Sequence, residues 1–133
     1  MLQHEYEVLI LESHLDTFGH VNNAAYLALF EEARWDIVHS RGYGLKKVQE
    51  THIGPTLLEV NLQFRREILL RERIKIKTSV LEHNRKTTKL SQVMFNEKGE
   101  EACAAVFTIG LFDLRLRKLI EPTPEWSYAI GLP

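Results

Sequence analysis

A polar turn between residues 13 and 23 holds most of the side chains in this sequence that could do chemistry. Its candidates are Asp16, Gly19, His20, Asn22 and Asn23. A carboxylate in a loop between two rigid elements can act as a base towards water or as a nucleophile. Either role needs a nearby group that stabilises the negative charge that develops on the substrate.

A helix that starts directly after the turn would supply that group. The first amides of a helix have no partner inside it and lie at the positive end of its dipole. Gly19 lets the backbone turn sharply and approach a substrate, while His20 and Asn23 add donors. Thioesters suit such a site best, because a thiol with a pKa of about 8.5 leaves as a thiolate without an acid. The alternative is an ordinary loop and helix cap, which use the same residue types.

The helix is predicted from apolar residues that recur at the spacing of one buried face. They are Tyr26, Phe30, Ala33 and Ile37, with Leu27 and Val38 widening the stripe. Asn22 can cap the first turn, and Gly42 and Gly44 provide the stop. A helix of about 18 residues is about 27 Å long, which is enough to cross a whole sheet.

About five strands are predicted around this helix, from β-forming residues and alternation of apolar with polar side chains. They are residues 4–12, 59–65, 73–80, 90–96 and 102–112. Val60, Leu62 and Phe64 form the apolar face of the second strand, and Gly99 suits a hairpin between the last two. Short links between consecutive strands imply an antiparallel sheet with the helix on one face, which is an α+β fold.

Two shorter segments complete the predicted order. Residues 45–51 form a short helical turn that Gly54-Pro55 breaks. The tail at residues 121–124 cannot continue a sheet, because it contains two prolines, and is expected on the surface. One helix rarely covers a five-stranded sheet and its edges, so we expect a homodimer or homotetramer, with edge strands as one possible contact.

Composition places the chain among globular proteins and excludes several functions. Its 133 residues fit a single domain, 1–133, with 44% apolar and 26% charged residues. A net charge of −1 gives no general attraction to nucleic acid or to an anionic membrane. The single cysteine, Cys103, fits a reducing compartment, and the first residues lack the features of a signal peptide. The expected location is the cytoplasm.

The run from Asp16 to Tyr26, DTFGHVNNAAY, resembles the hotdog-fold thioesterases of the 4-hydroxybenzoyl-CoA thioesterase type. That family has an aspartate, a small turn residue, and a helical tyrosine ten positions after the aspartate. The resemblance covers nearly the whole chain. It implies a long helix wrapped by an antiparallel sheet of about five strands. It also implies hydrolysis of acyl-CoA to free acid and CoA, with no cofactor besides the CoA of the substrate.

The resemblance also implies roles for single residues. Asp16 matches the catalytic carboxylate of the family, and Asn23 the position whose backbone amide polarises the thioester carbonyl. His20 matches the histidine of acyl-carrier-protein thioesterases. Phe18 stands where those enzymes have an asparagine, so their full catalytic set is not expected here. Tyr26 is expected to pack rather than to react.

Basic residues near strand ends are candidates for binding the phosphates of CoA. They are Arg65, Arg66, Arg85 and Lys86. The resemblance places the CoA nucleotide on the surface near these strand ends, often across a subunit interface. Neighbouring glutamates leave ordinary solvated charge as the alternative. The six histidines lack the close spacing of a zinc site, so no metal is expected.

Other functions stay open at this point. The first is a non-catalytic subunit of the same fold that binds acyl groups or CoA, and the second is an acyl-carrier-protein thioesterase. A hydratase or dehydratase is disfavoured, because the sequence lacks the His-Phe-Pro-Gly turn of those enzymes. The length and type of the acyl group are not readable from the sequence.

Overall fold

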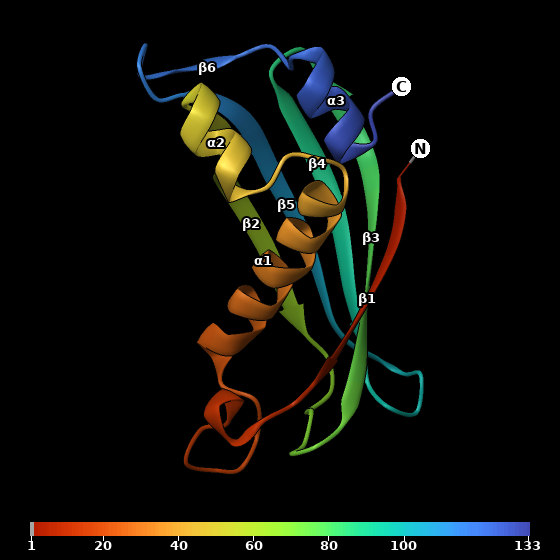
Figure 1. The fold of residues 1–133 in the computed structure, drawn as a ribbon. Helices are drawn as coiled ribbons and strands as arrows, with labels where there is room; N and C mark the ends of the chain where they lie inside the picture. Colours follow the sequence, from red (N-terminus) through yellow and green to blue (C-terminus); the bar gives the residue numbers. More distant parts are fainter. Residues whose placement is uncertain (1) are drawn as a thin grey trace.

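Helix α1 (Asn23–Ser40) lies across one face of a six-stranded antiparallel sheet (Figure 1). The structure is a computed structural model and describes residues 2–133. The other elements are β1 (Gln3–Leu9), the 3-10 turn η1 (Glu12–His14), α2 (Leu45–Thr51), β2 (Ile53–Phe64), β3 (Arg73–Asn84), β4 (Thr87–Phe95), β5 (Glu101–Asp113), β6 (Lys118–Ile120) and α3 (Pro124–Ile130). The predicted α+β architecture is confirmed.

The strands follow the order β1-β3-β4-β5-β2, and the short β6 pairs with the end of β5. β6 raises the strand count to six and was not predicted, because three residues carry too little pattern. The β4–β5 hairpin turns at Gly99, whose positive φ of 81° confirms the predicted turn. Among the described residues no helix is long and apolar enough to cross a membrane.

Helix α1 has the 18 residues that the sequence predicts, and the side chain of Asn22 caps it by accepting the amide of Ala24 at 2.8 Å. Its buried residues are Tyr26, Leu29, Phe30, Ala33, Ile37 and Val38. The prediction for Leu27 is wrong, since this side chain is 38% exposed. It lies on the same stripe of α1 as Arg34, whose surroundings include Pro55 and Leu57 of β2.

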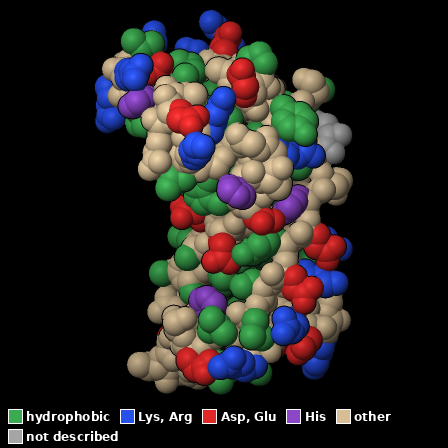
Figure 2. Space-filling model, in the orientation of Figure 1, with side chains coloured by type: hydrophobic (Ala, Val, Ile, Leu, Met, Phe, Trp, Pro, Cys, Tyr) green, Lys and Arg blue, Asp and Glu red, His purple; other side chains and the backbone are tan. Residues whose placement is uncertain are grey.

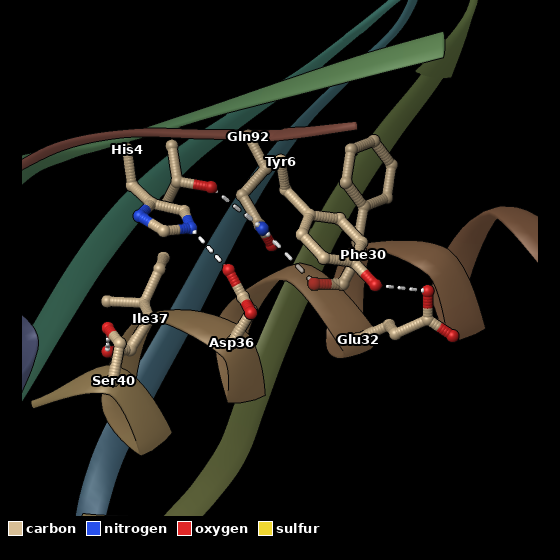
Figure 3. A network of polar contacts seen from close by, with 9 residues as sticks. His4, Tyr6, Phe30, Glu32, Asp36, Ile37, Ser40 and Gln92 are labelled. Carbon is tan, nitrogen blue, oxygen red and sulfur yellow. Dashed lines mark hydrogen bonds and ion pairs between the residues drawn. The ribbon is translucent and has the colours of Figure 1, made fainter. Parts of the chain in front are cut away.

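A network of polar contacts fixes α1 against the sheet (Figure 3). The fully buried amide of Gln92 on β4 donates to the carbonyl of Phe30 at 3.1 Å and to Oγ1 of Thr78 at 3.0 Å. From β1, the hydroxyl of Tyr6 donates to Glu32 at 2.7 Å. Because these contacts join α1 to β1 and β4, and Gln92 also bonds to Thr78 of β3, the helix has one defined position over the sheet.

The structure confirms the predicted helical turn at residues 45–51 as α2 but corrects the residue that ends it. Helix α2 ends at Thr51, with His52 as its left-handed C-cap, so strand β2 begins at Ile53 and runs through Gly54-Pro55, which an edge strand tolerates. The tail at residues 121–124 leaves the sheet and lies on the surface as predicted, with Glu121 and Pro124 exposed, but it leads into a helix, α3, that was not predicted. Thr123 caps α3, Pro124 occupies its first turn, and Trp126 is buried edge-to-face against Tyr43 with ring centroids 5.2 Å apart.

The apolar face predicted for β2 is buried only in part, because Leu62 packs partly buried against the core. By contrast, Leu57, Val60 and Phe64 are 46%, 37% and 53% exposed. Their cross-strand partners on β5 are buried under α1, so these side chains point to the helix side of the sheet. They are exposed because β2 is an edge strand that pairs only with β5 among residues 2–133. Figure 2 shows hydrophobic side chains exposed in patches on the face that carries α1.

Candidate active site

The turn before α1 holds the carboxylate of Asp16 in a fixed position. Oδ1 of Asp16 accepts the backbone amides of Phe18 at 2.9 Å and His20 at 3.3 Å. The backbone of Asp16 also bonds to His20, with its amide 2.9 Å from the carbonyl oxygen of that residue. Gly19 has a positive φ of 82°, which a residue with a side chain adopts only with strain. The turn therefore depends on both Asp16 and Gly19.

The loop between β2 and β3, residues 65–72, braces this turn. His20 forms an isolated β-bridge with Leu69, and the amide of Val21 donates to the carbonyl of buried Ile68 at 3.2 Å. On the other side, the amide of Asn22 donates to the carbonyl of His14 at 2.8 Å. These backbone contacts place Asp16 beside the start of α1.

Within residues 2–133, the backbone amide of Asn23 is a free donor in the first turn of α1. Asn22 accepts two of the first amides, that of Ala24 through its side chain and that of Ala25 through its carbonyl at 2.9 Å. The amide of Asn23 has no hydrogen-bond partner within the described chain. It lies at the positive end of the dipole of an 18-residue helix. An oxygen that gains negative charge would be stabilised there.

The ring of His20 faces a different carboxylate from that of Asp16. Its Nε2 lies 2.9 Å from Oε2 of Glu67 in the bracing loop, and both side chains are partly exposed. The structure therefore brings the backbone of His20 to Asp16 and its ring to Glu67.

Tyr26 packs as expected, and its surroundings also connect it to the turn. It is 4% exposed and contacts Phe64 edge-to-face, with ring centroids 5.0 Å apart. Burial raises the pKa of Tyr26 to about 12, and the negative charge of nearby groups, including Asp16, adds to the effect. Cys103 is buried, which raises the pKa of its thiol to about 11 and keeps it protonated. Cys103 therefore serves as a buried apolar residue rather than as a nucleophile.

The four basic candidates for CoA binding lie at two ends of the sheet. Arg65 and Arg66 follow Phe64, near the start of α1, and lie 3.8 Å and 3.6 Å from Glu101 and Glu100. Arg85 and Lys86 form the β3–β4 turn at the opposite end, next to Gly110. Arg85 is paired with Glu121 at 2.6 Å. A single chain does not bring the two pairs together.

Sequence reasoning missed Arg34, which lies on the same stripe of α1 as Asn23, Leu27 and Val38. Its guanidinium stacks on the ring of Phe107, 4.2 Å from the centroid, and donates through Nη1 to Oε1 of Gln92 at 2.8 Å. The position of a charged residue within this mostly apolar stripe could have marked Arg34 as a candidate functional residue in the sequence. Among residues 2–133 no three His, Cys, Asp or Glu side chains cluster in a way that could hold a metal ion.

Comparisons with known proteins agree with this fold and show the family. Residues 11–130 match the thioesterase-like superfamily. The chain is 32% identical to the long-chain acyl-CoA thioesterase FadM of Escherichia coli over 108 residues, which are 80% of this chain and 81% of FadM. The crystal structure of the probable thioesterase YbaW from E. coli is similar, with a TM-score of 0.80, 28% identity and 94% of each chain covered.

A hypothetical protein of Staphylococcus aureus, whose structure was solved in complex with CoA, has a similar fold but a low sequence identity. Its TM-score is 0.90 at 16% identity, covering 98% of this chain and 82% of that one. At this identity the similarity supports the fold alone, which is the hotdog fold predicted from the sequence.

Proposed function

Because this chain belongs to the thioesterase-like superfamily, we propose that it hydrolyses acyl-CoA thioesters to the free acid and CoA. The observation that carries this proposal is the pairing of a fixed carboxylate with a free helix amide. Asp16 is held by the amide of Phe18, and the amide of Asn23 has no partner within residues 2–133.

In the proposed reaction the thioester carbonyl oxygen accepts a hydrogen bond from the amide of Asn23. Oδ2 of Asp16 removes a proton from water, which attacks the carbonyl carbon, and the amide and helix dipole stabilise the oxyanion. The C–S bond then breaks, CoA leaves as a thiolate, and the acyl group leaves as a carboxylic acid. Direct attack by Asp16, through a mixed anhydride, uses the same groups. His20 supports the turn through its backbone and its contact with Glu67.

The enzyme is proposed to act as a homodimer joined at β2. This edge strand exposes Leu57, Val60 and Phe64 beside Leu27 of α1, an apolar strip that a second copy would cover. Antiparallel pairing of two β2 strands about a two-fold axis brings the end of one strand next to the start of the other. Arg65 and Arg66 would then approach Arg85 of the partner subunit, and the two basic pairs could share one CoA. The cytoplasmic location stays a prediction.

A thiol-release assay tests the proposal. The purified protein is supplied with short-chain, long-chain and aromatic acyl-CoAs, and free CoA is measured with a thiol reagent. We expect saturable release of one thiol per acyl group from at least one class. Binding of acyl-CoA in calorimetry without thiol release from any substrate would instead indicate a non-catalytic binding subunit. Faster release from an acyl carrier protein than from CoA would indicate the carrier-protein enzyme.

A further inference from the structure

A small cavity lies between α1, β2 and α3, away from the catalytic turn. Its volume is about 90 Å³, which is room for a carboxylate and a few neighbouring carbon atoms. Most of its lining is apolar and includes Trp35, Val38, Leu57, Ile109 and Trp126. The guanidinium of Arg34 is the cationic group in this lining.

The charge of Arg34 is not neutralised by an ion pair within the described residues. Among residues 2–133 Arg34 forms no ion pair, although Glu31 lines the same cavity. Desolvation lowers the pKa of Arg34, and the charge of Glu31 only partly opposes this effect. A partly buried cation without an ion partner is costly, so such groups are normally paired.

The buried residue Gln92 positions the guanidinium of Arg34. Gln92 is fully buried, and its Nε2 is fixed by Phe30 and Thr78, so its Oε1 is oriented towards Nη1 of Arg34. This bond uses one of the five N–H donors of the guanidinium. Stacking on the ring of Phe107 fixes the orientation of the guanidinium plane of Arg34. Arg34 is thus pre-oriented, with donors left for a planar anion.

The cavity and the catalytic turn lie along one line. Asn23, Leu27, Arg34 and Val38 are spaced four, seven and four apart, which places them on one stripe of α1. The eleven residues from Asn23 to Arg34 span about 16 Å of helix. Leu27 lies on this stripe, and Val60 pairs with Phe107, on which Arg34 stacks, so apolar side chains accompany the path, which in the proposed dimer runs along the subunit interface. An extended acyl chain bound with its thioester at the amide of Asn23 would therefore reach Arg34 with its far end.

We propose that Arg34 binds a carboxylate at the far end of the acyl group, so that this cavity selects acyl chains that end in an acid. This inference rests on the proposed function for the identity of the ligand. The carboxylate itself can be tested without any hydrolysis.

Intrinsic fluorescence gives a direct binding test, because both tryptophans of the chain, Trp35 and Trp126, line the cavity. Heptanoate should change the emission saturably, while the neutral heptanamide should bind about tenfold more weakly or worse. Arg34→Met should lose heptanoate binding, and Arg34→Lys should keep part of it. The matched control, Arg115→Met, removes an exposed arginine and should bind like the wild type. Circular dichroism checks that each variant is folded.

Hydrolysis then tests the substrate class. The ratio of kcat/KM for dodecanedioyl-CoA over dodecanoyl-CoA should fall about ten- to a hundredfold in Arg34→Met, mainly through KM. Equal heptanoate binding in the wild type and Arg34→Met, or equal kcat/KM ratios, would overturn the inference. If no acyl-CoA is hydrolysed but heptanoate binds through Arg34, the proposed function fails and the carboxylate site stands.

Discussion

The backbone amide of Phe18 donates a hydrogen bond of 2.9 Å to Oδ1 of Asp16. The amide of His20 bonds to the same oxygen, and within the described residues Oδ2 accepts no hydrogen bond. One oxygen of Asp16 thus builds the turn, and the other is available for chemistry. An asparagine at this position keeps an acceptor for the turn but cannot act as a base.

Gly19 should matter for activity beyond its effect on stability. In Gly19→Ala the new methyl group meets no atom within 4 Å, so there is no steric clash. The backbone φ of 82° nevertheless strains any residue with a side chain by about 1 kcal/mol. We expect kcat/KM to fall, because relief of the strain moves Asp16. Gly42→Ala is the matched control, with a φ of 85° and equally open space near the other end of α1. Equal activity in the two variants would contradict this role.

The core network around Gln92 should dominate the local stability of α1. Gln92→Leu removes the bonds to Phe30 and Thr78 (Figure 3). It also leaves Arg34 without its acceptor. We expect a loss of about 1–3 kcal/mol in the free energy of unfolding, measured with urea. Thr78→Val removes only one of these bonds and should cost less. A Gln92→Leu protein as stable as the wild type would show that the network contributes nothing.

Local signals in the sequence predicted α1 and its turn well. The helical period and the Asn22 cap act within a few residues, so they place Asp16 and Asn23 near each other without knowledge of the rest of the fold. Helix α3 also carried local signals, namely Thr123 as a cap and Pro124 in the first turn. They were interpreted as a chain break, because proline serves both purposes.

The features that were missed depend on strand order. The pattern of β2 shows an apolar face, but only the finished sheet shows that β2 is an edge strand whose Val60 stays exposed. Arg65 and Arg85 lie apart because the β2–β3 connection and the β3–β4 hairpin turn are at opposite ends of the sheet. That Arg34 has no ion-pair partner among residues 2–133 is a result of three-dimensional packing and has no counterpart in a sequence pattern.

Stability at alkaline pH should depend on Tyr26. Its pKa is raised from 10.0 to about 12 in the folded protein, so folding favours the protonated phenol. This contribution is complete below pH 10 and is lost as the pH rises from 10 through about 12. The free energy of unfolding of Tyr26→Phe should therefore fall less over this range than that of the wild type, in urea titrations at fixed pH. Parallel curves for the two proteins would be evidence against a buried, unionised Tyr26.

The β2 edge should control self-association. Val60→Glu places a charge in the exposed apolar strip and should shift the protein from dimer to monomer in sedimentation experiments. Leu116→Glu changes a residue that is 61% exposed in the β5–β6 turn and should leave the dimer intact. A wild-type protein that is monomeric at all concentrations would remove the basis of the proposed interface.

Thiol release by the Asp16→Asn variant tests the central claim most directly. Asp113→Asn is a matched control, because Oδ1 of Asp113 accepts the amides of Arg115 and Leu116 in a similar turn at the other end of the sheet. We predict that Asp16→Asn keeps the wild-type circular dichroism spectrum and loses about 10²- to 10⁴-fold in kcat. Asp113→Asn should retain full activity. An Asp16→Asn protein that hydrolyses every tested acyl-CoA at the wild-type rate would contradict the assignment of Asp16 as the catalytic group.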